Sequence, residues 1–282
     1  MRSVVITGVS TGIGWGATKV LTGKGFHVFG SVRNAADAAR LKSEFGNAFT
    51  AMVFDVTDET GARAAARSVR EALAGQTLAG LVNNAGIAVS GPLLYLDIDD
   101  FRRQLDVNLT GVLIVTQAFA PLLGADTSLK GEKGRIVNIS SVGGRSASPF
   151  LGPYSASKFA LEGFSESLRR ELLLLGIDVI VIGPGAVATP IWGKAEQEDV
   201  SRYANTPFAP ALVKVRDYML GLGKIGLKPE RIGEAIHLAL TLRKPKVRYA
   251  VTPQPLQEFM TRTLPKRQVD KIIGKRLGLL PE

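Results

Sequence analysis

The sequence predicts an α/β fold with a doubly wound, mostly parallel seven-stranded sheet and helices on both of its faces. Two observations lead to this fold class. Short apolar segments alternate with helix-like segments from the first residues onward, and these segments are near-continuous apolar runs, as strands covered on both faces require. A glycine-rich turn follows the first of them directly and opens the first helix, which is typical of the first βα unit in such sheets.

Each strand is predicted from one apolar run bounded by turn-forming residues. We expect strands at residues 3–7, 27–32, 49–55, 78–83, 135–140, 177–182 and 246–252. Because the connections between them are long enough to hold a helix, most neighbouring strands are expected to run parallel.

The helices are predicted from apolar periodicity and from the residues at their ends. Gly23 ends the first helix, an alanine-rich helix separates the second and third strands, and residues 58–74 form the next. Residues 99–119 predict one long helix. A further helix ends at Gly176, a typical C-terminal glycine, and residues 229–242 form the last helix of the alternating pattern.

The segment 186–228 departs from this alternation and predicts a lid. It is rich in Pro, Gly and aromatic residues, among them Trp192, Tyr203, Phe208 and Tyr218. Long irregular insertions after the carboxyl end of a strand are often functional. With no internal repeat or linker, we expect one domain: residues 1–242 as the main body with its lid, and residues 243–282 as the last strand and a C-terminal extension.

Composition excludes several kinds of site. The chain of 282 residues has no cysteine and only two histidines, His27 and His237, so a disulfide, a thiolate metal site and a histidine-based triad are not expected. The start of the chain runs straight into a strand-like segment, and no apolar run approaches the roughly 20 residues of a membrane span. We therefore expect a soluble, cytoplasmic protein without a metal.

The positive charge is concentrated near the C-terminus. Ten Lys and Arg residues stand against two acidic ones between Arg243 and Arg276, a balance of +8 in a chain of net charge +10. This basic stretch lacks the interleaved aromatic residues of a nucleic-acid groove, so nucleic-acid binding is not expected.

Tyr154 and Lys158 form the most informative pair in the sequence. They are four residues apart, near the start of a helix whose first turn suits Pro153, and such spacing places both on one helix face. A nearby ammonium favours the phenolate and lowers the pKa of a tyrosine, which would make Tyr154 a proton donor or acceptor for an alcohol and a ketone. The alternative is a half-buried tyrosine followed by a solvated lysine.

The turn after the first strand is a candidate phosphate cradle. Its glycines are Gly8, Gly12 and Gly14, a GxxxGxG spacing that differs from the common GxGxxG. Glycines at such a turn let the backbone approach a pyrophosphate, and the helix start supplies free N–H groups. The turn could also be a tight strand-to-helix connection, but its place in the first βα unit favours cofactor binding.

The end of the second strand bears on which dinucleotide binds. An acidic residue there would hold the ribose 2′-hydroxyl of NAD, whereas an arginine accommodates the 2′-phosphate of NADP. This chain has Arg33 and no acid before Asp37. With the hydroxyls of Ser10 or Thr11, Arg33 favours NADP(H), and NAD(H) stays possible; the alternative for Arg33 is a solvated loop residue.

With these motifs in this order, the chain resembles the single-domain short-chain dehydrogenases/reductases over about residues 3–242. The resemblance implies a Rossmann-type dinucleotide-binding and catalytic domain. It also implies a set of cofactor-binding residues, which are Gly8, Ser10, Thr11, Gly12, Ile13, Gly14, Arg33, Asp55, Val56, Asn84, Ala85, Gly86, Tyr154, Lys158, Pro184, Gly185, Val187 and Thr189.

The catalytic residues implied by the same resemblance are Asn108, Ser141, Tyr154 and Lys158. Ser141 lies thirteen residues before Tyr154, the family spacing for the serine that hydrogen-bonds the substrate oxygen, with Ser140 as the adjacent alternative. Tyr154 would exchange a proton with that oxygen while the nicotinamide exchanges a hydride with the carbon. Lys158 would lower the tyrosine pKa, and Asn108 would link Lys158 to a proton-relay water.

The lid predicts the substrate class. Its large side chains suit an apolar alcohol or carbonyl, and the chain looks most like the steroid- and retinol-dehydrogenase branch. They are Ile191, Trp192, Phe208, Leu212, Val213, Tyr218, Met219, Leu220 and Leu222. The alternatives are a 3-oxoacyl-thioester reductase and a non-catalytic NADP-sensing protein of the same fold.

The C-terminal extension has apolar residues at helical spacing among its basic ones. They are Leu256, Phe259, Met260, Leu264, Val269, Ile272, Ile273 and Leu277. One interpretation is an interfacial helix on anionic lipid. The interpretation we favour is that this apolar face packs over the lid or a neighbouring subunit. Family resemblance further implies a homodimer or homotetramer formed partly through the Tyr154 helix.

Overall fold

The computed structural model describes residues 2–189 and 200–281. It confirms the predicted fold class: seven strands form one sheet in the order β3-β2-β1-β4-β5-β6-β7, and all of its neighbours pair in parallel. The strands are β1 Ser3–Ile6, β2 His27–Val32, β3 Phe49–Val53, β4 Gly80–Asn83, β5 Arg135–Ile139, β6 Asp178–Pro184 and β7 Arg248–Val251.

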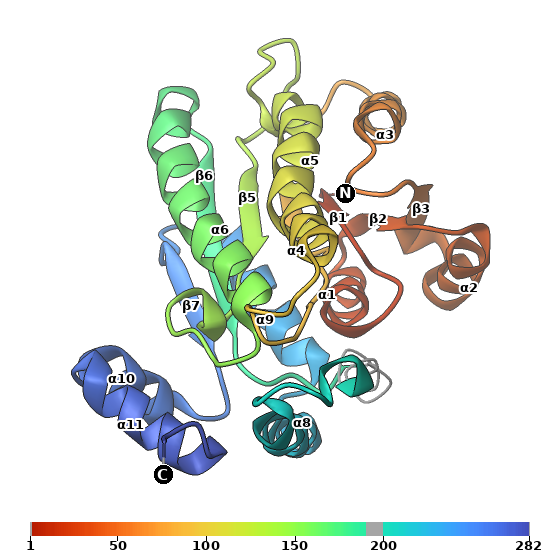
Figure 1. Cartoon of the computed structure of the whole chain (residues 1–282). Helices are drawn as coiled ribbons and strands as arrows, with labels where there is room; N and C mark the ends of the chain where they lie inside the picture. The colour runs from red at the N-terminus through yellow and green to blue at the C-terminus, as the bar shows by residue number, and fades with distance from the viewer. Residues whose placement is uncertain (1, 190–199, 282) are drawn as a thin grey trace.

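Helices flank this sheet as the alternating sequence pattern predicts (Figure 1). The α-helices are α1 Gly12–Gly23, α2 Ala35–Phe45, α3 Glu59–Ala72, α4 Ile98–Leu105, α5 Gly111–Phe119, α6 Gly152–Glu171, α8 Ala209–Lys224, α9 Pro229–Thr241, α10 Pro255–Thr263 and α11 Lys266–Leu277. Short 3₁₀ turns are η1 Gly46–Ala48, η3 Ala120–Leu123, η4 Val142–Gly144, η5 Leu172–Leu175 and η6 Val200–Tyr203.

The helix predicted as one piece over residues 99–119 is interrupted. A π-helical turn, η2 Asp106–Thr110, separates α4 from α5. Apolar periodicity does not reveal such a turn, because one extra residue shifts the pattern only slightly. π turns inside α-helices often occur at functional sites, and this one carries Asn108.

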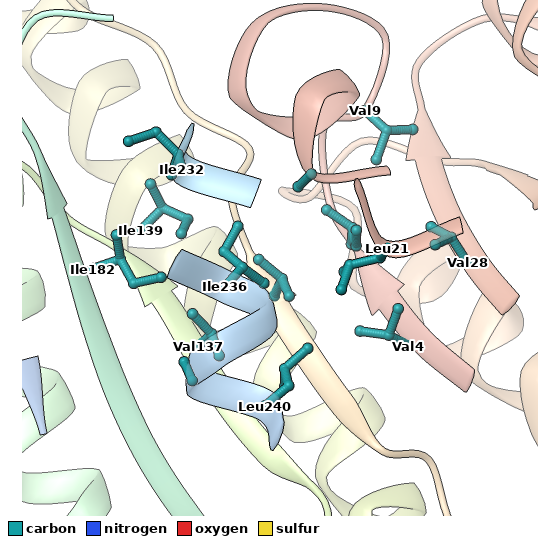
Figure 2. Close-up of a cluster of buried hydrophobic side chains, with 14 of the residues drawn as sticks. Val4, Val9, Leu21, Val28, Val137, Ile139, Ile182, Ile232, Ile236 and Leu240 are labelled. Carbon is teal, nitrogen blue, oxygen red and sulfur yellow. The ribbon is translucent and has the colours of Figure 1, made fainter. Parts of the chain in front are cut away.

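Two hydrophobic cores lie on opposite faces of the sheet, because successive strand residues point to opposite sides. Val4 and Ile6 belong to the core under α1, α2 and α9, whereas Val5 belongs to the core under α3 and α5. Figure 2 shows the first core, with Leu21 of α1 close to β1 and Ile236 of α9 close to β5.

α1 and α9 approach each other closely through glycines. A Cβ atom on Gly16 would lie 2.6 Å from the carbonyl carbon of Pro229, and one on Gly233 would lie 2.9 Å from the carbonyl oxygen of Gly16. This contact fixes α1 against the sheet and therefore fixes the glycine turn that opens it.

One helical run, Ile98–Leu123, is long and apolar enough by length and composition to cross a bilayer. Its second half packs into the core under α3 and α5, where Val115 and Phe119 are fully buried. We interpret it as a core helix of the sheet.

The lid and the C-terminal extension pack against each other. Leu212 of α8 is buried with Phe150 and Tyr203, and Leu279 of the extension joins this cluster. α11 lies alongside α8, with the Arg276 guanidinium 4.2 Å from the centre of the Tyr218 ring (Figure 1). The predicted lid residues Ile191 and Trp192 lie outside the described residues.

The apolar stripe of the extension divides between its two helices. Val269 and Leu277 of α11 are buried, in agreement with packing over the lid. On α10, by contrast, Leu256 is 70% exposed and Phe259 is 62% exposed. Packing over the lid therefore accounts for Val269 and Leu277 of α11; for the exposed residues of α10, cover by a neighbouring subunit stays a prediction.

Candidate active site

The predicted site residues gather where the central strands end. The glycine turn follows β1, Asn84 follows β4, Ser141 follows β5, and Pro184 ends β6. Because these strands are parallel neighbours, their carboxyl ends lie at one edge of the sheet. This edge is where open α/β sheets bind their ligands.

Ser141, Tyr154 and Lys158 meet at this edge. The side chains of Ser141 and Tyr154 lie together, since a Cβ atom on Gly143 would lie 3.3 Å from Ser141 Oγ and 3.5 Å from Tyr154 Cε1. The Lys158 ammonium lies 5.8 Å from the centre of the Tyr154 ring. The Lys158 ammonium donates a hydrogen bond to the carbonyl of Ile139, at 2.8 Å. The Ser141 hydroxyl accepts one from the backbone N–H of Gly143, at 2.9 Å.

The structure also separates the two neighbouring serines. Ser141 faces Tyr154, whereas the hydroxyl of Ser140 is buried, with no hydrogen-bond partner among the described residues. A Cβ atom on Gly144 would lie 2.7 Å from that hydroxyl. The geometry thus favours Ser141 over Ser140.

Asn108 fastens the loop after β4 to helix α6. Its side-chain oxygen accepts from the backbone N–H of Ile87 at 2.9 Å, and its amide donates to the Ile87 carbonyl at 3.0 Å and to the Ser157 hydroxyl at 3.1 Å. Ser157 in turn donates to the carbonyl of Tyr154, at 2.7 Å. Asn108 is therefore linked through Ser157 to the backbone of Tyr154; its role in a water relay stays a prediction.

Gln104 joins this network and was missed by sequence reasoning. It is fully buried; its side chain donates to the carbonyl of Ile87 at 3.0 Å and accepts from the N–H of Val89 at 2.7 Å. The sequence does hold one sign of this role, because Gln104 lies one helical turn before Asn108 and therefore on the same helix face. Buried amide side chains of this kind are retained where their hydrogen bonds are satisfied.

The pKa of Tyr154 differs from the expectation. Burial raises it above the ordinary value of 10.0, and the hydrogen bond from Ser141 opposes this rise. We expected the Lys158 ammonium to bring the Tyr154 pKa below its ordinary value; instead, burial in low dielectric penalises the phenolate most and sets the net direction. Tyr154 is thus held as a neutral phenol, the form that donates a proton.

The pKa of Lys158 moves in the opposite direction. Burial lowers it from 10.5 to about 8, while the carboxylate of Glu162 opposes that change. A buried lysine that is charged at neutral pH is costly for folding. The buried ammonium of Lys158 therefore lowers the stability of the folded state, which makes Lys158 a candidate functional residue.

We predict that Lys158→Met stabilises the fold while removing activity. At pH 7 its free energy of unfolding should exceed that of the natural protein by up to about 3 kcal/mol, since each pKa unit corresponds to about 1.4 kcal/mol. Between pH 8 and 10.5 the unfolded natural chain binds more protons at Lys158 than the folded one, so its stability rises with pH and the gap closes.

Urea unfolding at pH 7 and pH 10 measures this difference. Lys24→Met, at an exposed position, is the matched control and should change neither stability nor its pH dependence. A Lys158→Met protein that is less stable than the natural one at both pH values would contradict the prediction.

The glycine turn is held by hydrogen bonds from the neighbouring strand ends. Gly8 and Gly12 have positive φ angles, +68° and +60°. The N–H of Gly8 donates to the Ser31 hydroxyl at 3.0 Å, and the Asn84 amide donates to the carbonyls of Thr7 and Gly8 at 2.8 and 3.0 Å. Asn84, predicted as a cofactor contact, thus braces the turn through its side chain.

The first turn of α1 suits an anion. The N-cap Thr11 makes no side-chain capping hydrogen bond, and the first N–H groups of any α-helix lack an intrahelical acceptor. Opposite them, a Cβ atom on Gly12 would lie 3.2 Å from the Cγ2 methyl of Thr189. The structure therefore brings the glycine turn and the predicted nicotinamide loop within van der Waals contact.

The other predicted cofactor residues lie around this opening. The Asp55 carboxylate accepts from the N–H and hydroxyl of Thr57 at 3.0 and 2.8 Å, and Val56 is buried beside Gly111. Val187 is buried where residues 186–188 bridge to Leu227. Ile13, Ala85, Gly86, Pro184 and Gly185 flank the same edge, in or next to α1, β4 and β6.

Two arginines stand at the far end of the turn. Arg33 is exposed just after β2, as predicted for a 2′-phosphate partner. Arg40 of α2, which sequence reasoning missed, donates to the carbonyl of Ser10 at 2.7 Å and pairs with Asp37 at 3.0 Å. Arg40 thereby also holds the turn, and it adds a second positive charge near the expected 2′-phosphate.

Comparison with known proteins agrees with this geometry. Residues 2–200 match the profile of the short chain dehydrogenases. The chain belongs to the short-chain dehydrogenase family. The match identifies it as an oxidoreductase. Membership of this family also accounts for the predicted fold and for the order of the motifs along the chain.

Individual relatives cover nearly the whole chain. It is 37% identical over 283 residues to an NADPH-dependent 3-dehydrocapnine reductase of Ornithobacterium rhinotracheale, covering 100% of this chain and 99% of the relative. It is 33% identical to dehydrogenase/reductase SDR family member 9 of Bos taurus, covering 88% and 79%. A solved short-chain dehydrogenase of Streptomyces avermitilis superposes with a TM-score of 0.75 at 24% identity, covering 97% and 94%, and shows the shared fold.

Proposed function

We propose that this short-chain dehydrogenase interconverts a lipophilic alcohol and its carbonyl compound with NADP(H). The observation that carries the proposal is the grouping of Ser141 and Tyr154 beside Gly143, with the Lys158 ammonium 5.8 Å from the Tyr154 ring, at the sheet edge where the glycine turn lies. The four residues expected to act on an alcohol or carbonyl are all present in this chain: Asn108, Ser141, Tyr154 and Lys158. Their presence argues against a non-catalytic NADP-sensing protein.

Tyr154, Ser141 and Lys158 each have a separate role in the proposed reaction. The nicotinamide, when bound, supplies or accepts the hydride. Tyr154, a neutral phenol beside Ser141, donates its proton to the oxygen of a carbonyl in the reducing direction. Ser141 holds that oxygen through its hydroxyl, as a preorganised donor. Lys158 keeps a positive charge next to the tyrosine as its proton leaves.

The charge on Lys158 gives the reaction a pH dependence. Its pKa of about 8 lies close to neutrality, and the phenolate left on Tyr154 is stabilised only while Lys158 is protonated. Turnover in the reducing direction should therefore fall as pH rises through about 8.

The choice of NADP(H) rests on charge at the ribose end of the site. Arg33 and Arg40 lie there, no acid precedes Asp37, and one close relative is named as NADPH-dependent. A 2′-phosphate would pair with the Arg33 guanidinium and with Arg40, which also pairs with the carboxylates of Asp37 and Glu44.

We predict that Arg33→Asp shifts preference from NADPH to NADH. A carboxylate at the end of β2 repels the 2′-phosphate and hydrogen-bonds the free 2′-hydroxyl. The ratio of kcat/KM for NADPH over that for NADH should fall by about 10- to 100-fold, the range of one or two lost charge-assisted hydrogen bonds. Arg63→Asp, an exposed change on α3, is the control; a marked NADH preference of the natural protein would refute the argument from Arg33.

The substrate class is inferred from the lid. Leu212 packs with Phe150 and Phe208, so one wall of the lid is apolar and aromatic. Such a wall supports a lipophilic substrate and speaks against a small polar one. The 3-oxoacyl-thioester alternative would use the basic extension to hold an acidic carrier, but no observation on the site favours it.

A substrate panel tests the proposal. Steroids, retinoids and long-chain alcohols and ketones are compared with small polar carbonyls, each with NADPH and NADH. Turnover of an apolar compound with NADPH is the expected result. Turnover of only small polar carbonyls would overturn the lipophilic assignment.

We also propose that the protein is a soluble, cytoplasmic homodimer or homotetramer built partly through α6. Phe159 of α6 is 45% exposed and Leu113 of α5 is 41% exposed, and a second copy would cover them. Light scattering would report a mass that is a multiple of 30.0 kDa. Peripheral membrane contact through the extension remains the interpretation we do not favour.

A further inference from the structure

A buried ion pair lies directly behind the catalytic residues, and the reaction described above does not use it. Arg248, the first residue of β7, donates from its Nε to both carboxylate oxygens of Glu162, at 3.1 and 3.0 Å. Its Nη2 donates to the backbone carbonyl of Ser141 at 3.2 Å, across 107 residues of sequence. The two side chains are only 9% and 15% exposed.

The path of the arginine side chain is built into the sheet. β6 lies between β5 and β7, so the guanidinium of Arg248 must cross β6 to reach Ser141. It crosses at Gly183, where a Cβ atom would lie 2.4 Å from its Nη2. A side chain at position 183 would push Arg248 away from Ser141.

Glu162 connects this pair to the other catalytic residues. It lies on α6, four residues after Lys158 and eight after Tyr154, a spacing that places all three on one helix face. Its carboxylate raises the pKa of Lys158 against the stronger effect of burial. Arg145 also lies near this carboxylate, with its Nε 3.6 Å from Oε2 of Glu162.

The burial of this pair calls for an explanation beyond stability. Buried ion pairs contribute little net stability, because desolvation offsets the attraction between the charges. The Arg170–Glu166 pair on the same helix has side chains 64% and 55% exposed and touches no site residue. The contact of Arg248 with the Ser141 backbone is what distinguishes the buried pair.

We propose that Arg248 and Glu162 are positioning residues: Arg248 fixes the backbone that carries the Ser141 hydroxyl, and Glu162 holds Arg248 while balancing the Lys158 ammonium. The inference rests on the roles of Ser141 and Lys158 in the proposed function. Ser141 then donates to the substrate oxygen from a backbone whose carbonyl is held twice, by the N–H of Gly144 at 3.1 Å and by Arg248 at 3.2 Å.

Variants of the full-length protein test the pair. Arg248→Met keeps the apolar stem and removes the guanidinium; it is expected to lower kcat by about 10²-fold, the effect of a misplacement on the order of 1 Å, with the Kd for NADPH unchanged. Glu162→Gln should move the alkaline limb of the kcat–pH profile to lower pH, because it removes the charge that raises the Lys158 pKa. Arg248→Lys should restore part of the lost kcat.

A double variant and a control separate positioning from folding. Arg248→Met with Glu162→Met removes both charges of the pair, so its melting temperature should exceed that of Arg248→Met alone while its kcat stays low. Arg170→Met, which breaks the exposed pair on the same helix, should change neither the melting temperature nor kcat.

Two results would overturn the inference: natural kcat in Arg248→Met or in the double variant, or an unmoved alkaline limb in Glu162→Gln. If Ser141→Ala and Tyr154→Phe also retain turnover, the proposed function fails. If those two lose turnover while the Arg248 variants keep it, only the positioning role fails.

Discussion

Tyr154→Phe should lower turnover by about 10²- to 10⁴-fold, the usual contribution of a positioned acid or base, while the Kd for NADPH stays close to that of the natural protein. The substitution removes only the phenol oxygen that hydrogen-bonds Ser141. The ring remains and fills the same space, so the site should keep its shape. Steady-state kinetics and a fluorescence titration with NADPH measure the two effects separately.

Tyr249→Phe is the matched control for this loss of one hydroxyl. Its oxygen accepts a hydrogen bond from the backbone N–H of Lys246 at 3.1 Å and plays no part in the proposed reaction. This variant should turn over like the natural protein. A Tyr154→Phe enzyme that keeps full turnover would show that the proton comes from elsewhere.

Gly14→Ala should disrupt cofactor binding more than any other single methyl group added to α1. The new Cβ atom would lie 2.2 Å from the carbonyl oxygen of Gly8 and 2.6 Å from the Asn84 amide nitrogen. Relief requires that the turn move, and overpacking of this kind costs about 1–3 kcal/mol. If that strain falls on the bound state, the Kd for NADPH rises by about 5- to 150-fold.

Gly23→Ala, at the end of the same helix, is the matched control. No heavy atom lies within 4 Å of a Cβ atom built there, so the added methyl should leave the Kd unchanged and raise stability by about 0.5–1 kcal/mol. Thermal unfolding and the NADPH titration read out both variants. An unchanged Kd in Gly14→Ala would mean that the turn does not hold the cofactor.

Local sequence signals predicted most of the fold. The central strands were predictable because they are apolar runs with both faces covered, as Val4 and Val5 show by belonging to opposite cores. The glycine turn was predictable from its place after β1. The π turn at Asn108 was not, because a single inserted residue leaves almost no trace in the apolar pattern.

The candidate site was predictable only where its residues follow a fixed spacing. Tyr154 and Lys158 share one helix face, and Ser141 precedes them at the family distance. Arg248 and Glu162 escaped notice because their contact joins β7 to α6, and sequence carries no local sign of it. The direction of the Tyr154 pKa escaped notice too, because it depends on burial by residues distant in sequence.

The central claim is that Tyr154 protonates a carbonyl oxygen while the carbon receives a hydride from NADPH. The most direct measurement is a single turnover of a long-chain ketone with NADPH deuterated at the transferred position, followed by mass spectrometry of the alcohol. The account predicts one deuterium on the carbinol carbon with the natural protein, and incorporation slowed by about 10²-fold or more with Tyr154→Phe. Equal incorporation by the two proteins, or no incorporation from any carbonyl with either cofactor, would contradict it.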